Sequence, residues 1–95
     1  MPVHFIIRFT VKPDSVSAFR SLLADVKASL PHVEGCKSIQ VLNQLDQPLV
    51  FTLVEAWDTQ AQHGAHVAHL IDSRSWAAVE AHLAAAPTSA YFNEL

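Results

Sequence analysis

The chain has 95 residues and a formal net charge of −3, and 51% of its residues are hydrophobic while only 16% are charged. This length is typical of one domain, so we expect a single domain over residues 1–95. A chain so short cannot bury so much apolar surface by itself, which predicts a homodimer. The Lys and Arg residues are scattered and form no basic stripe, so nucleic acid is not expected as a partner.

The sequence also disfavours an oxidising compartment, secretion and a membrane span. A single cysteine cannot form an internal disulfide, so an oxidising compartment is not required. The start of the chain, residues 1–5, lacks the basic and long apolar segments of a signal peptide. No segment approaches the roughly 20 apolar residues that a helix needs to cross a bilayer. We therefore expect a soluble cytoplasmic protein without a membrane partner.

The first half of the chain predicts a strand followed by a helix. Apolar and polar residues alternate over residues 3–11, which is the period of a strand. Pro13 breaks this pattern, and apolar residues then recur at helical spacing over residues 16–30. Pro31 ends the predicted helix, because the residue before a proline disfavours the helical conformation.

A hairpin is predicted next. Gly35 allows a turn into a second strand over about residues 36–43. Residues 44–48 are polar and turn-like, and a third strand follows over about residues 49–57.

The rest of the chain predicts a broken helix and a last strand. Helical segments are expected over residues 61–71 and 76–85, and a short strand over residues 89–94. The order strand, helix, strand, strand, helix, strand is that of the ferredoxin-like split β-α-β-β-α-β arrangement. We therefore predict an α+β fold with a four-stranded antiparallel sheet and its helices on one face.

The alternation also suggests which residues face the helices. The odd-numbered residues of the first strand are all apolar and suit the helices, which leaves His4 and Arg8 on the other face. In the third strand the small even-numbered residues suit the helices. The far face would then carry Phe51, Leu53, Glu55 and Trp57. Two such faces joined across a twofold axis would form a dimeric α/β barrel.

Four short stretches resemble a known family: Val11-Lys12-Pro13, Glu34-Gly35-Cys36, Glu55-Ala56-Trp57, and His66 in the next helix. Through them the whole chain resembles the antibiotic biosynthesis monooxygenase domain family of dimeric α/β barrels. That family includes cofactor-free oxygenases of polycyclic phenols, quinol monooxygenases, haem-degrading enzymes and an isomerase linked to a signalling sugar. The fold alone does not choose among these activities.

His66 is the first candidate for a catalytic base. It borders the apolar arc of the helix over residues 61–71, so its ring can face a pocket and still titrate near its reference pKa of about 6.5. A packed or surface histidine is the alternative interpretation. His63 lies inside the apolar arc, and the resemblance aligns it with a tyrosine of a cofactor-free phenol oxygenase. Together with His69 these histidines cannot converge on one ion, so no metal is expected.

Glu55 is the candidate that most needs a partner. A carboxylate on a mostly apolar face requires a partner or a raised pKa. Because the first and third strands should be antiparallel, we expect Glu55 to pair with His4, either structurally or as part of a site. Arg8 is expected farther along the same strand, where it would be able to hold a substrate phenolate or carboxylate.

The leading hypothesis is a cofactor-independent monooxygenase that oxidises a phenolic or quinol-type aromatic molecule. His66 would remove the phenolic proton, and His63 or Arg8 would stabilise the resulting oxyanion. The residues expected to bind the substrate are Trp57, Phe51, Leu53, Glu55 and His4. The alternatives are a non-catalytic module that binds a small hydrophobic metabolite and an oxygen-independent isomerase of the same fold.

Overall fold

The structure is a computed structural model that describes residues 2–95. In chain order its elements are β1 (Val3–Thr10), α1 (Val16–Ser29), β2 (Cys36–Gln44), β3 (Gln47–Trp57), α2 (Gln60–Asp72), α3 (Ser75–Glu80) and β4 (Thr88–Phe92). Short 3₁₀ turns flank α1 on both sides. The strands form one sheet in the order β2-β3-β1-β4, and every neighbouring pair is antiparallel. The predicted α+β ferredoxin-like fold is confirmed.

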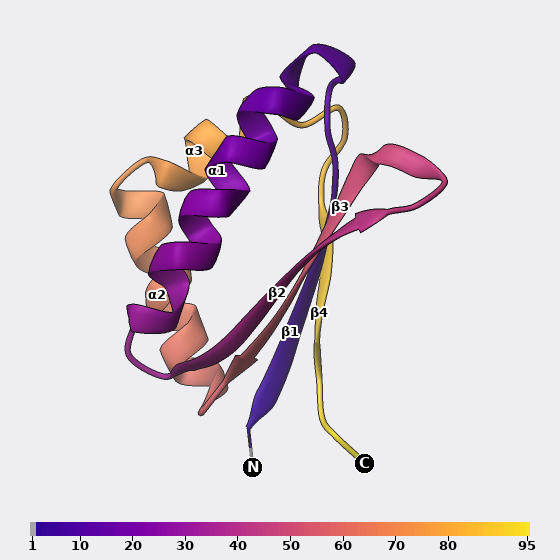
Figure 1. Cartoon of the computed structure of the whole chain (residues 1–95). Helices are drawn as coiled ribbons and strands as arrows, with labels where there is room; N and C mark the ends of the chain where they lie inside the picture. Colours follow the sequence, from indigo (N-terminus) through magenta and orange to yellow (C-terminus); the bar gives the residue numbers. More distant parts are fainter. Residues whose placement is uncertain (1) are drawn as a thin grey trace.

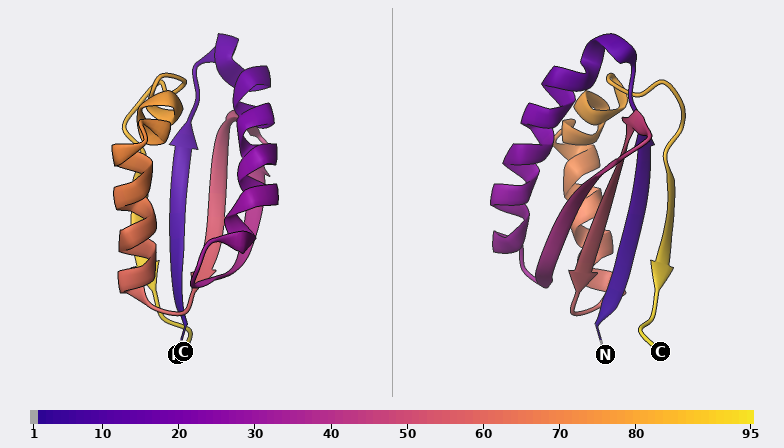
Figure 2. Two further views of the ribbon diagram at one scale, coloured as in Figure 1. Left: turned by 90° about the vertical axis from the view of Figure 1, so that its left-hand side faces the viewer. Right: turned by 45° about the vertical axis from the view of Figure 1, so that its right-hand side comes forward.

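All the helices lie on one face of the sheet. Figure 1 shows α1, α2 and α3 on the same side of the strands, while the other side of the sheet is uncovered. Figure 2 shows that α1 and the α2–α3 pair stand next to each other over this face, with β1 visible between them. The space between the two helical units therefore lies directly above β1 and β3.

The last helix is shorter than predicted. The sequence predicts a helix over residues 76–85, whereas α3 ends at Glu80. After α3 a turn with local backbone hydrogen bonds runs to Leu83, and the chain then bonds to the end of β1 and the residues after it. The Lys12 N–H donates to the His82 carbonyl, and the Ala84 N–H donates to the Thr10 carbonyl. At the other end of α3, Arg74 has a left-handed φ of 64°, which separates α3 from α2.

The register of β1 and β3 corrects the predicted faces of the third strand. Directly paired residues of an antiparallel ladder point to the same side of a sheet. Phe5 is paired with Glu55 and Phe9 with Phe51, so the odd-numbered residues of both strands face the helices. Phe51, Leu53, Glu55 and Trp57 are accordingly buried under the helices. The prediction that they lie on the far face is wrong.

The open face of the sheet is partly apolar. The even-numbered residues of β1 lie on it, and Ile6 is paired there with Val54 of β3 and Ala90 of β4. Leu42 and Phe92 also remain 49% exposed. Within residues 2–95 no helix is long and apolar enough to cross a membrane.

Phe19 of α1 joins the helices to the sheet. Its side chain is fully buried, and its ring centroid lies 5.4 Å from that of Phe9 and 5.5 Å from that of Phe51. We expect Phe19→Ala to lower the free energy of unfolding by about 3–5 kcal/mol, because it leaves a cavity at the centre of the core. Urea denaturation measures this change. Leu45→Ala, in the fully exposed hairpin turn, is the control and should cost less than about 0.5 kcal/mol.

Candidate functional site

A cavity of about 630 Å³ lies between the sheet and the two helical units. Its floor is formed by Phe5, Ile7 and Phe9 of β1 and by Leu53 and Glu55 of β3. Residues of α1 line one wall, and residues of α2 and α3 line the other. The volume is within the range of about 300–1,000 Å³ that is common for small-molecule sites, and most of the lining is apolar.

The first turn of α2 is fixed over the end of β3. The Thr59 hydroxyl caps this helix by accepting a hydrogen bond from the Gln62 N–H at 3.2 Å. Gln62 also packs against the turn at Gly35, where φ is 89° and an added Cβ would lie 2.5 Å from the Gln62 side chain. Because Gly35 has no side chain, the first turn of α2 is able to lie close to this turn. As a result, His63 and His66 lie over the carboxyl end of β3.

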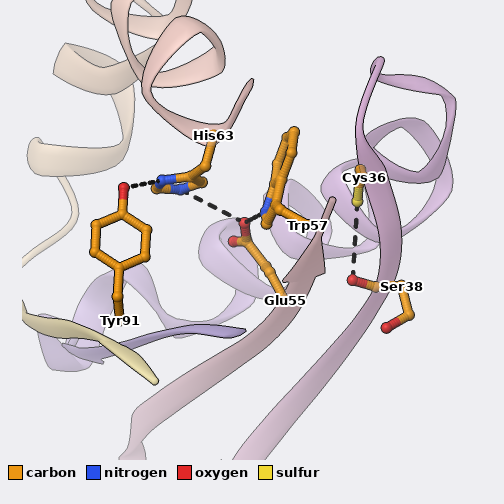
Figure 3. Close-up of polar contacts among 6 residues, drawn as sticks. All are labelled: Cys36, Ser38, Glu55, Trp57, His63 and Tyr91. Carbon is orange, nitrogen blue, oxygen red and sulfur yellow. Dashed lines mark hydrogen bonds and ion pairs between the residues drawn. The ribbon is translucent and has the colours of Figure 1, made fainter. Parts of the chain in front are cut away.

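Four side chains, of which all but Tyr91 are buried, form a polar network at this end of the cavity (Figure 3). The Trp57 indole N–H donates to Oε1 of Glu55 at 2.9 Å, and Nε2 of His63 lies 3.8 Å from the same oxygen. Nδ1 of His63 forms a hydrogen bond with the hydroxyl of Tyr91. Both Glu55 and His63 are almost fully buried. We refer to these residues as the Tyr91–His63–Glu55–Trp57 network.

Burial sets the protonation of this network. Desolvation lowers the pKa of His63 to about 4, and the neighbouring His66 contributes to the decrease. The imidazole of His63 is therefore neutral at pH 7. Desolvation raises the pKa of Glu55, and the hydrogen bond from Trp57 partly opposes this increase. Desolvation and the charge of Glu55 both raise the pKa of Tyr91, which keeps its hydroxyl protonated.

These protonation states determine the tautomer of His63. A neutral imidazole has one N–H and one acceptor nitrogen. The tautomer follows from the hydrogen-bond pattern: an N–H at Nε2 points toward the Glu55 carboxylate, and Nδ1 accepts from the Tyr91 O–H. Because 3.8 Å is too long for a hydrogen bond, the Nε2–H of His63 is oriented by Glu55 but is not bound by it.

His66 lies one turn further along α2 and also lines the cavity. It is half-buried, and its ring centroid lies 5.4 Å from that of Trp57. Desolvation lowers the pKa of His66, and the neighbouring His69 adds to the decrease. No side chain among residues 2–95 forms a hydrogen bond with the His66 ring. Its nitrogens are therefore able to bind a ligand. His66 also lines an outer groove of about 450 Å³, so it stands where the cavity and that groove meet.

The structure brings together some of the residues singled out from the sequence. His66, His63, Glu55 and Leu53 all line the cavity. Trp57 is not part of the lining; it lies behind the two histidines, with its ring centroid 5.2 Å from that of His63.

Three other candidates lie elsewhere. Phe51 is buried in the core against Phe19 and does not line the cavity. His4 and Arg8 belong to the even-numbered residues of β1 and lie on the open face of the sheet. Arg8 is exposed there and donates to the Gln44 side chain at 3.3 Å. The expected pair of Glu55 with His4 is wrong, because Phe5 and not His4 is opposite Glu55.

Tyr91 is the site residue that sequence reasoning did not place. Its position follows from β4 pairing with β1, which puts Tyr91 opposite Phe5 on the helix face. The Phe5 ring packs against both polar side chains, and its centroid lies 4.0 Å from that of His63 and 5.2 Å from that of Tyr91. Two features of the sequence analysis could have placed Tyr91: the strand order of the ferredoxin-like fold and the alternation of residues in the last strand. Within residues 2–95, no group of three or more His, Cys, Asp or Glu side chains is arranged to hold a metal ion.

Comparisons with known proteins agree with this architecture. The model of the antibiotic biosynthesis monooxygenase family matches residues 2–93. The chain belongs to this family. The Rv0793 protein of Mycobacterium tuberculosis is 26% identical with a TM-score of 0.85, over 100% of this chain and 96% of that one. No curated protein matches the chain.

Two further solved structures share the fold of this family member. A protein of Nitrosomonas europaea, described as a candidate antibiotic biosynthesis monooxygenase, is 24% identical with a TM-score of 0.86, over 99% of this chain and 90% of that one. A conserved protein of Methanosarcina mazei is 18% identical with a TM-score of 0.89, over 100% of this chain and 94% of that one. At these identities the likeness concerns the fold alone.

His63 of this monooxygenase-family chain should make stability depend on pH. Its pKa is 6.5 when unperturbed and about 4 in the folded chain, so the unfolded state binds the proton more readily. The contribution of His63 is therefore complete above pH 6.5 and is lost as the pH falls to about 4, with an upper limit of about 3 kcal/mol. We expect His63→Gln to remove this slope in urea unfolding measured across that pH range.

The control for this experiment is His32→Gln at an exposed position, which should keep the wild-type slope. Glu55 acts in the opposite direction: its raised pKa gives a contribution that is greatest at acid pH and declines as the pH rises. The comparison is therefore repeated in a Glu55→Gln background. A wild-type slope in His63→Gln would contradict the neutral, buried state assigned to His63.

Proposed function

We propose that this chain is a cofactor-independent monooxygenase acting on a phenolic or quinol-type aromatic small molecule. The observation that carries the proposal is His66, a histidine without a hydrogen-bond partner among residues 2–95 that lines an otherwise apolar cavity. Membership in the antibiotic biosynthesis monooxygenase family supports the reaction class. The cavity supports an aromatic ligand, because planar apolar rings fit a lining rich in phenylalanine, leucine and valine.

His66 is assigned as the general base. Its lowered pKa keeps the imidazole neutral at pH 7, so a ring nitrogen is able to accept the proton of a phenolic hydroxyl. The Nε2–H of His63 is assigned as the donor to the developing oxyanion, because Tyr91 and Glu55 hold this ring in one tautomer. Arg8 is not assigned a role, since it lies on the opposite face of the sheet.

The proposed reaction on a quinol ring needs no external reductant. The phenolate passes one electron to O₂, and the superoxide and ring radical then join through a new C–O bond. The peroxide takes back the proton held by His66, and the hydroperoxide then loses one molecule of water, formed from the ring C–H proton and the distal OH as the O–O bond breaks, which leaves a hydroxyquinone. One atom of O₂ stays on the ring and the other leaves as water, so all four electrons come from the substrate. The residues of the chain contribute a base, a hydrogen-bond donor and a dry cavity.

Removal of the base tests this proposal directly. We expect His66→Ala to lower kcat by about 100-fold or more in oxygen uptake by the purified, metal-free protein with a panel of hydroquinones and polycyclic phenols. In the wild type, kcat/KM should rise with pH to a plateau, with an apparent pKa below 6.5, because His66 must be deprotonated.

His32→Ala removes an exposed histidine outside the cavity and should retain the wild-type rate. An unchanged rate in His66→Ala would show that another group is the base. Absence of uptake by the wild type across the panel, with ligands still binding, would instead favour the binding module or the oxygen-independent isomerase.

We also propose that the open face of the sheet binds a second copy of the chain, giving a dimeric α/β barrel. Members of this family are often dimeric. The face combines Ile6 and Val54 at its centre with the exposed side chains of Leu42 and Phe92. Apolar side chains gathered on one side of a sheet are typical of a contact surface.

A charge at the centre of this face should separate the copies. We expect Ile6→Asp to be monomeric in size-exclusion chromatography with light scattering, because a dimer would bury two unpaired carboxylates. Lys27→Asp, on the exposed side of α1, is the control and should remain dimeric. Circular dichroism checks that both variants are folded. A folded Ile6→Asp dimer, or a monomeric wild type, would contradict this interface.

A further inference from the structure

The lining of the cavity is acidic and contains no cation. Glu55 lies on the floor and Asp25 of α1 lies at the wall, and no Lys or Arg among residues 2–95 belongs to the lining. The six basic residues of the chain lie elsewhere, at Arg8, Lys12, Arg20, Lys27, Lys37 and Arg74. The histidines of the lining carry no charge at neutral pH, so the net charge of the site is negative or zero.

This charge pattern disfavours anionic ligands. A carboxylate or phosphate that entered the cavity would lose water and meet two acidic side chains without an opposing charge. Proteins that bind such groups commonly supply Arg or Lys for them. Glu55, His63 and His66 are the polar groups at one end of the cavity, and the other polar side chains of the lining are Asp25, Trp76 and three serines. The lining therefore disfavours a ligand that carries a carboxylate or a phosphate.

The cavity also extends beyond its polar end along β1. Phe5, beside Glu55, and Phe9 both line the floor and are four residues apart on β1, which corresponds to about 13 Å along a strand. At the Phe9 end the facing groups are apolar, and the Phe9 ring centroid lies 6.4 Å from that of Trp76 in α3. Figures 1 and 2 show that the start of α2 and the whole of α3 lie toward opposite ends of β1.

The apolar end is lined mainly by side chains of α1 and α3: Leu22, Val26, Trp76, Ala78 and Val79. The indole N–H of Trp76 is the one side-chain polar group among these five residues. A single aromatic ring placed with its hydroxyl at His66 would leave this part of the cavity without a ligand.

We propose that the cavity selects an uncharged phenol or quinol bearing a hydrocarbon substituent, whose hydroxyl lies at the Glu55–His63–His66 end and whose substituent lies along α1 and α3. This inference rests on the proposed function, since it takes the reacting hydroxyl to lie at His66. It adds the charge and shape of the ligand, which neither the family nor the proposed reaction specifies.

Binding measured without turnover tests the selectivity. The wild type is titrated by calorimetry under argon with hydroquinone, hexylhydroquinone, and the same hexyl compound ending in a carboxylate. Each buried methylene should tighten Kd by about fourfold, so hexylhydroquinone should bind at least about 100-fold more tightly than hydroquinone. The carboxylate-terminated compound should lose about tenfold or more of that gain.

Matched variants locate the substituent and the charge effect. Ala78→Phe fills the apolar end and should move the ratio of the hydroquinone and hexylhydroquinone Kd values toward one. Ala77 and Ala78 are both exposed but only Ala78 lines the cavity, so Ala77→Phe should preserve the ratio. Asp25→Lys should strengthen binding of the carboxylate-terminated compound about threefold or more, whereas Asp14→Lys makes the same charge change outside the cavity and should not.

The outcomes separate this inference from the proposed function. Equal affinity of the wild type for all three compounds, or an unchanged ratio in Ala78→Phe, would overturn the selectivity. Tight binding that depends on the substituent, without oxygen uptake for any compound, would support the selectivity and overturn the monooxygenase proposal. Oxygen uptake with no preference for the substituted compound would overturn the selectivity alone.

Discussion

The buried carboxylate of Glu55 is the constraint on which the site depends. A charged group that is 6% exposed is costly unless polar partners surround it. The Trp57 N–H provides one partner from β3, and the Nε2–H of His63 provides a second dipole from α2. Removing one partner would leave the carboxylate unsatisfied, at a cost of about 1–3 kcal/mol or more. The need of the Glu55 carboxylate for a polar partner therefore helps to fix the position of α2 over the sheet.

The same carboxylate organises the cavity beyond its own contacts. Because Glu55 orients Nε2–H of His63, the opposite nitrogen must accept, and Tyr91 of β4 is the donor that meets it. Tyr91 remains 39% exposed, so the network runs from the centre of the sheet to its edge strand. The polar groups are thereby concentrated at one end of the cavity. His66 lies beside them, where burial lowers its pKa and leaves it able to accept a proton at neutral pH.

The sequence predicted the elements and the topology well because both depend on local periodicity and turn residues. Alternation indicated β1, the glycine turn at Gly35 preceded β2, and α1 ends at Ser29, two residues before Pro31. His63 and His66 were identified from their place on an amphipathic helix. Their location in the cavity agrees with that reasoning, although their catalytic roles stay predictions. The end of α3 was missed because it depends on backbone bonds to β1 that no local pattern records.

The faces of the third strand were not accessible from local patterns. Alternation shows that Phe51 and Glu55 share a side, but it does not show which side meets the helices. Side-chain size was the only guide, and it favoured the small residues. The decisive information is the pairing of Phe5 with Glu55, which is a long-range property of the sheet. Tyr91 escaped prediction for the same reason, since its neighbour on β1 is fixed only when the sheet forms.

The assignment of odd-numbered residues of β1 and β3 to the helix face also determines the charge of the cavity. In β1 and β3 the titratable residues His4, Arg8 and Glu55 are divided between the two faces by register alone. A slip of β1 by one residue would turn Arg8 and His4 toward the helices and place its apolar residues on the open face. The wholly apolar odd-numbered face of β1 prevents such a slip, because a slip would bury the charged Arg8 and would expose Phe5, Ile7 and Phe9, whose burial stabilises the fold. The hydrophobic pattern of the first strand thus keeps cations out of the cavity, and the absence of an arginine at the site is a consequence of how the core is specified.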